Sequence, residues 1–168
     1  MMLPHEVDNL VRENMAQIKA DKAGKADKSA PRVVLVPTHM IDGIWPNVVA
    51  GFQKASRRSG GDLTVGDLWV GCRSGHCFLF IVHEGDDVKA ATVWKPETWQ
   101  SGTKFRCMAL YGQGMGEWMP ELHEMVKTVA RDCGASSLVA EGREGWRKIF
   151  PHTRKIRTLY EEPIDGRQ

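Results

Sequence analysis

The sequence lacks both a strong net charge and any long hydrophobic run. Its 168 residues include 23 Lys and Arg against 21 Asp and Glu, which gives a net charge of +2. This balance favours neither nucleic-acid binding nor attachment to a membrane surface. No apolar stretch approaches the roughly 20 residues of a transmembrane helix, and the opening MMLPHEVDNLVREN is too polar for a signal peptide. We therefore expect a cytoplasmic protein that is not attached to a membrane, and we do not expect nucleic acid as its direct ligand.

Cysteine is also scarce, with four residues in the chain. Without an export signal, these thiols are expected to stay reduced. Cys72 and Cys77 lie close to His76 in CRSGHC, a grouping that invites a metal-site interpretation. Because no second ligand pair follows at zinc-finger spacing, we predict no metal site and thiols that pack against other side chains.

The N-terminal part differs in composition from the rest of the chain. Residues 1–18 predict an amphipathic helical arm, residues 19–32 a polar linker, and residues 33–168 the main domain. The apolar positions of the arm recur at three- and four-residue steps and share one face; they are Val7, Leu10, Val11, Met15 and Ile18. This face packs either on its own domain or, as an interface, on another subunit.

From residue 33 onward, apolar runs and amphipathic patterns alternate. Strands are predicted at 33–37, 76–85, 88–96, 103–112, 136–142 and 156–164. Helices are predicted at 40–56, around 65–70, at 117–133 and at 143–150. The turn EGDD between two of the strands indicates an antiparallel hairpin. Together these elements predict an α/β fold with a mixed, mostly antiparallel sheet flanked by helices.

A glycine-rich turn joins the strand at 103–112 to the long helix after it. Its residues are Gly112, Gln113, Gly114, Met115 and Gly116. Backbone N–H groups at the start of a helix can hold a phosphate, which makes this turn a candidate cofactor-binding loop. A tight strand-to-helix turn also requires glycine for its positive φ, so the motif alone leaves both interpretations open.

The order of elements over about 33–164, with this turn at its centre, resembles the Gcn5-related N-acetyltransferase (GNAT) fold. Members of that family carry Arg/Gln-x-x-Gly-x-Gly/Ala before their main helix, where the pyrophosphate of acetyl-CoA binds. Here the corresponding residues run from Tyr111 to Gly116, with both glycines present and tyrosine in place of Arg or Gln. The resemblance implies a GNAT-like domain and, if it is an enzyme, acetyl-CoA as cofactor at 112–116.

The segment from Gly114 to Phe150 also resembles small GNAT-like proteins encoded by tailed bacteriophages. The shared features include a tryptophan early in the main helix and Gly-Arg-x-Gly-Trp after the next strand, here Gly142 to Trp146. This resemblance implies a phage-encoded protein that is expressed in the host cytoplasm or carried in the virion.

The catalytic groups that the resemblance implies are only partly present. The strand at 103–112 has no carboxylate to serve as general base, so the candidates are Glu84 and His83, acting through water. The tyrosine that usually serves as general acid in the family is replaced by Phe150, which has no proton to donate. Tyr160 is the remaining candidate for the general acid. Glu117, at the helix start, would repel a pyrophosphate.

Trp94 and Trp99 flank KPET, which we predict to be a hairpin-end loop with exposed aromatic residues that could anchor an interface. The preferred hypothesis is a non-catalytic virion or assembly component, as an internal virion or head-to-tail connector protein without a cofactor. Its partners would be other phage virion proteins or copies of itself. The alternative is an acetyl-CoA-dependent N-acetyltransferase that acts on an amine of a host protein or small molecule.

Overall fold

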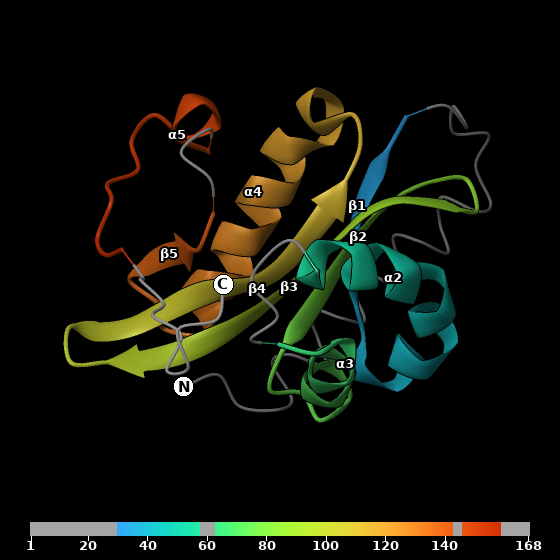
Figure 1. Cartoon of the computed structure of the whole chain (residues 1–168), viewed down its shortest axis with the longest axis horizontal. Coiled ribbons are helices and arrows are strands. Elements are labelled where there is room, and N and C mark those ends of the chain that lie inside the picture. The colour runs from blue at the N-terminus through green and yellow to red at the C-terminus, as the bar shows by residue number, and fades with distance from the viewer. Residues whose placement is uncertain (1–29, 58–62, 143–145, 159–168) are drawn as a thin grey trace, which may run out of the picture.

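A computed structural model describes residues 30–57, 63–142 and 146–158 (Figure 1). The strands are β1 (Arg32–Val36), β2 (Phe78–Glu84), β3 (Asp87–Trp99), β4 (Gly102–Gly112) and β5 (Ser137–Ala140). The helices are η1 (Thr38–Met40), α2 (Ile41–Ser56), α3 (Val65–Arg73), α4 (Met115–Asp132) and α5 (Trp146–Ile149). The predicted arm at 1–18, with its interface residues, and nearly all of the linker lie outside the described residues.

The five strands form one sheet in the order β1-β2-β3-β4-β5. Strands β1 to β4 pair with one another in antiparallel fashion, whereas β5 pairs with β4 in parallel. Helices α4 and α5 lie on one face of this sheet and α2 and α3 on the other (Figure 1). The predicted α/β class, with a mixed and mostly antiparallel sheet, is therefore confirmed.

Strict alternation along the strands builds a separate core on each face. In β1 and β2, the side chains of Val33, Leu35 and Phe80 point to α4, while Leu79 and Ile81 point to the opposite helices. Both cores are continuous across the sheet, which accounts for the unbroken apolar runs in these strands. The apolar residues of α4 recur at the helical period as a stripe that is buried beneath the helix; they are Met119, Leu122, Val126, Val129 and Ala130.

Strand β4 has a bulge halfway along its length. Val93 of β3 pairs with Ala109 and the next residue, Trp94, pairs with Cys107, so Met108 is the extra residue. On its other side β4 pairs with β5 only from Lys104 to Cys107. Beyond the bulge, residues 108–112 have no neighbouring strand on that side in the part of the chain that the structure describes.

Two predictions from the sequence are wrong: the loop predicted at KPET and the described part of the strand predicted at 156–164. KPET is part of strand β3, which continues to Trp99, so Trp94 and Trp99 do not flank a loop. Cross-strand pairing with β4 extends the strand through Pro96, although proline usually interrupts one. The strand predicted at 156–164 is absent over its described part, 156–158, where the chain has no regular structure. The remainder, 159–164, lies outside the described residues.

Candidate functional site

The glycine turn between β4 and α4 is shaped by close packing. A β-carbon at Gly112 would collide with Ala90 on β3 and with the Trp118 ring. Trp118 is buried and its Nε1 donates to the Gln113 carbonyl over 2.8 Å. Gly114 is the N-cap of α4 with φ of 66°, in the left-handed region that favours glycine. These contacts hold the turn in one conformation at the start of the helix.

The helix start offers backbone donors to an anion. No side chain caps the first turn of α4, and a β-carbon at Gly116 would meet nothing within 4 Å. The first N–H groups of an α-helix have no intrahelical acceptor, and the helix dipole favours negative charge there. Gln113, Gly114 and Gly116 are exposed. The turn therefore offers backbone donors to an anion, and the assignment of residues 112–116 to cofactor binding stays a prediction.

Two side chains at the turn do not assist an anion. The Tyr111 ring lies over Gly51 of α2 and meets Phe52 edge-on, with ring centroids 5.1 Å apart. Burial raises the pKa of the Tyr111 phenol to about 12. Tyr111 is therefore turned toward α2 and supplies no charge to the loop. The exposed Glu117 carboxylate would lie only 3.9 Å from a β-carbon at Gly114, close to where an anion would bind.

Two of the three predicted catalytic residues, His83 and Glu84, are the last residues of β2. His83 and Glu84 lie at the β2–β3 turn, where His83 Nδ1 contacts the Gly85 carbonyl and Glu84 pairs with Lys89 at 3.4 Å. Phe150 follows α5, stacked on Trp146 and close to His123 of α4. Tyr160 lies outside the described residues. The catalytic assignments of His83, Glu84 and Tyr160 stay predictions.

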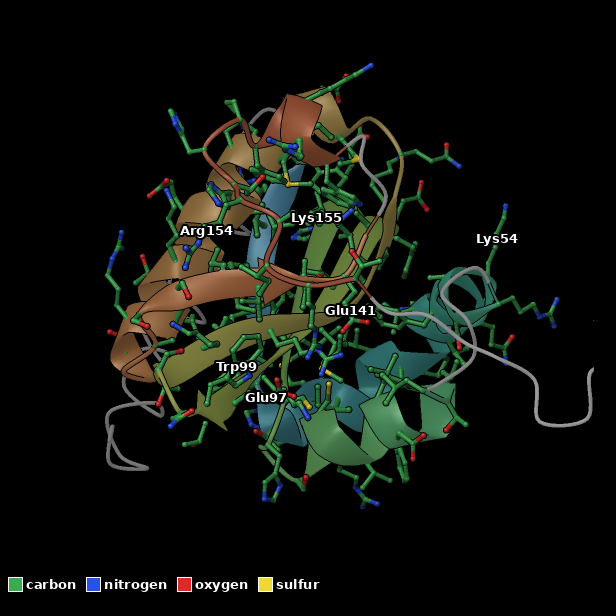
Figure 2. All side chains as sticks on the ribbon, turned by 60° about the vertical axis from the view of Figure 1, so that its left-hand side comes forward. Lys54, Glu97, Trp99, Glu141, Arg154 and Lys155 are labelled. Atoms are coloured by element: carbon green, nitrogen blue, oxygen red, sulfur yellow. The ribbon has the colours of Figure 1, made fainter. Side chains whose placement is uncertain are left out.

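The structure brings together a charged network that sequence reasoning missed. Arg106 on β4 donates from Nη1 to Glu97 Oε1 at 3.1 Å and from Nη2 to Glu141 Oε1 at 2.8 Å. Arg157 donates to the same Glu141 oxygen at 2.8 Å. Because two of them lie on the β3–β4 hairpin, we call Glu97, Arg106, Glu141 and Arg157 the hairpin network. Figure 2 shows Glu97 on this hairpin and Glu141 near it. No local pattern signals it, because the residues that bond to one another are 9, 35 and 16 residues apart.

The electrostatics of the hairpin network keep Glu97 ionised. Burial opposes its charge, but hydrogen bonds from Trp99, Arg106 and Lys95 outweigh burial and lower the pKa of Glu97 below its usual value. Because Ala140 pairs with Cys107, Glu141 follows β5 at the level of the β4 bulge. A carboxylate thus lies where β4 and β5 part.

The two tryptophans predicted as interface anchors have partners within the domain. Trp94 stacks on Phe105, with ring centroids 5.7 Å apart, and joins the core beneath α4. Trp99 donates from Nε1 to Glu97, and the Arg157 guanidinium lies 5.5 Å from the centre of its ring. Trp94 is therefore half-buried against the core, and the assignments of Trp94 and Trp99 to an interface stay predictions.

The thiols behave as packing groups in the described core. Cys72 is buried, and burial together with the neighbouring Cys77 raises its pKa to about 12. In the described ranges, no cluster of three or more His, Cys, Asp or Glu side chains could hold a metal ion. None of the helices described combines the length and apolar character required to cross a bilayer.

The strand order, the β4–β5 pairing that ends at the β4 bulge and the glycine turn before a long helix match a GNAT-like fold, as known structures show. A predicted acetyltransferase from Clostridium acetobutylicum, solved with acetyl-CoA, is similar at a TM-score of 0.57 and 9% identity, covering 82% of this chain and 98% of the other. The aminoglycoside acetyltransferase HMB0005, from an uncultured soil metagenomic sample, gives 0.60 and 10%, covering 80% and 99%.

A GCN5-related N-acetyltransferase from Ralstonia eutropha gives a TM-score of 0.57 at 14% identity, covering 82% of this chain and the whole of the other. No protein-family model matches the sequence, and no curated protein does either. At such identities the likeness establishes the fold. Activity has to be argued from the site itself.

Proposed function

We propose that the protein is an acetyl-CoA-dependent N-acetyltransferase that acts on an amine. The observation that carries this proposal is the free half of β4, which runs from the bulge at Met108 to the glycine turn of α4. Residues 108–111 are only partly buried and Gly112 is exposed, although β4 is not an edge strand of the sheet. The acetyltransferase structures with the same fold support this interpretation over a purely structural role.

Backbone groups of the glycine turn and of β4 beyond the bulge would bind different parts of acetyl-CoA. Backbone N–H groups of Gly114 to Gly116 would hold the pyrophosphate without help from a cationic side chain. Acetyl-CoA, when bound, supplies an activated acetyl thioester. Backbone groups of β4 beyond the bulge would orient that thioester, because no strand pairs with them on the β5 side in the described structure.

Glu141 is the residue best placed to hold the acceptor. Its Oε1 accepts hydrogen bonds from Arg106 and Arg157, and its Oε2 would accept one from an amine. Acetyl transfer forms a carbon–nitrogen bond, breaks the thioester carbon–sulfur bond and releases an amine proton, which Glu141 or water would take up. Phe150 has no proton to donate, so water would have to protonate the thiolate that leaves.

Calorimetric titration with acetyl-CoA tests the proposal. We expect the wild-type protein to bind with micromolar affinity. In Gly116→Glu the affinity should fall about tenfold or more, because a carboxylate is placed among the backbone N–H groups proposed to bind the pyrophosphate. Gly43→Glu is the matched control, because Gly43 also lies in a first helical turn with open space around it. No heat up to millimolar acetyl-CoA would overturn the proposal.

A second candidate is a non-catalytic assembly role, such as a phage virion component. It is favoured by the position of Glu117 at the anion site, by Tyr111 turned toward α2 and by Phe150 in place of an acid. Its partners would be virion proteins or further copies of the chain, contacted through the arm at 1–18. Deletion of residues 1–18 should then change the molar mass in light scattering while acetyl-CoA produces no heat.

A further inference from the structure

Thr92 is the one buried polar residue among the described residues, with 1% of its surface exposed. It lies in the middle of β3, between the apolar residues Ala91 and Val93. Its Oγ1 donates to the carbonyl of Ala109 over 2.8 Å. Ala109 is the residue that directly follows the extra residue of the β4 bulge.

The hydrogen bonds around Thr92 determine which groups act as donors. A threonine hydroxyl has a single proton, and Thr92 donates it in a hydrogen bond to the Ala109 carbonyl. The Cys107 thiol therefore acts as donor, either to Thr92 Oγ1 at 3.6 Å or to the same carbonyl at 3.7 Å. Burial raises the pKa of Cys107 to about 11, which keeps its proton in place. Two side chains, one on each strand, thus converge on one bulge carbonyl.

The bulge decides which way the second half of β4 faces. Phe105 points to the α4 core, and strict alternation would turn Ala109 and Tyr111 to that same face. Instead, Met108 and Ala109 both lie on the α2 face, after which Leu110 returns to α4 and Tyr111 to α2. A residue that fixes the bulge therefore fixes the orientation of everything between it and the glycine turn.

We propose, resting on the proposed function, that Thr92 is a positioning residue for acetyl transfer. Its hydroxyl holds the Ala109 carbonyl and so sets the backbone of residues 108–110, the part of β4 against which the acetyl thioester would be oriented. Thr92 itself is buried and touches no substrate. It acts through the bulge.

Hydrogen exchange, read by NMR for each amide, tests the hold on the bulge. In Thr92→Val we expect exchange at 108–110 to quicken about tenfold or more relative to the wild-type protein, with 103–106 unchanged. Thr92→Ser retains the hydroxyl and should exchange like the wild-type protein. Thr98→Val makes the same chemical change at an exposed position of β3 and serves as the control. If Thr92→Val fails to fold, Thr92→Cys supplies a weaker donor and should give an intermediate rate.

Steady-state kinetics test the consequence. Thr92→Val should lower kcat about tenfold or more while KM for acetyl-CoA changes less than about twofold, and Thr92→Ser should restore kcat. Unaltered exchange at 108–110 in Thr92→Val overturns the proposal whatever the activity. Faster exchange with unaltered kcat overturns it as well, since the bulge would then move without consequence. A wild-type protein that neither binds nor uses acetyl-CoA refutes the proposed function instead, and exchange alone then decides whether Thr92 holds the bulge.

Discussion

The ring of Tyr111 packs on the bare backbone of Gly51, in the space that any β-carbon on that residue would need. This contact joins α2 to the end of β4, one residue before the glycine turn begins. Phe52 closes the other side of the ring edge-on. The position that the GNAT motif fills with Arg or Gln is thus occupied by a side chain that fastens a helix to the sheet.

Gly51→Ala should therefore destabilise the protein. Inserting a methyl group into a packed contact typically costs about 1–3 kcal/mol, because the ring and the helix must move apart. Urea denaturation measures the change. Gly43→Ala on the same helix meets nothing within 4 Å and should be neutral or stabilising by up to about 1 kcal/mol. Equal effects of the two substitutions would contradict the packing role of Gly51.

Glu117→Gln should strengthen acetyl-CoA binding, if the proposed function holds. The substitution removes a negative charge beside the N-cap of α4 while keeping the shape of the side chain. We expect a gain of about threefold to tenfold in affinity at low salt, shrinking as salt screens the charge. Calorimetric titration at two salt concentrations measures it. Glu121→Gln, exposed one turn further along α4, is the control and should leave the affinity unchanged.

The two arginines of the hairpin network should differ in their effect on stability. Arg106 is 21% exposed and serves both Glu97 and Glu141, so Arg106→Ala should cost about 1–3 kcal/mol by leaving two carboxylates without their shared donor. Arg157 is 56% exposed, and Arg157→Ala should cost less than about 1 kcal/mol. Urea denaturation of both variants and of the double variant measures the coupling. A larger loss from Arg157→Ala would show that the C-terminal segment, not β4, carries the network.

His123 should make the stability fall as the pH drops below neutral. Burial lowers the pKa of His123, with Lys127 adding to this and Glu124 opposing it. The unfolded chain then binds the proton more readily than the folded protein. The stabilising contribution is complete above the unfolded pKa of 6.5 and is lost as the pH falls through the folded value.

Thermal unfolding between pH 7.5 and 5 measures this contribution. We expect it to stay below about 1 kcal/mol, because solvent reaches part of the ring. In His123→Gln the decline over this range should flatten. If the variant and the wild-type protein decline in parallel, the loss arises from other groups.

Local patterns in the sequence were enough to place most of the elements. The β2–β3 hairpin, the α4 stripe and the glycine turn are each written within a few neighbouring residues, where period and turn chemistry act. The KPET segment was mispredicted because proline normally ends a strand, whereas here pairing with β4 carries the strand through it. The hairpin network was missed because its residues are far apart in the chain and meet only through the register of β3, β4 and β5 and the path of the C-terminal segment.

By itself, the sequence determined that β4 would carry no carboxylate, that residue 150 would have no proton to donate, and that glycines would occupy the turn before α4. Those are properties of single residues and their neighbours in the chain. Only the tertiary structure decided that Met108 is the extra residue of a bulge, that Tyr111 faces α2, and that Glu141 lies where β4 and β5 part. The reason is that a bulge is set by hydrogen bonds across strands, here between Thr92 and Ala109, which lie 17 residues apart.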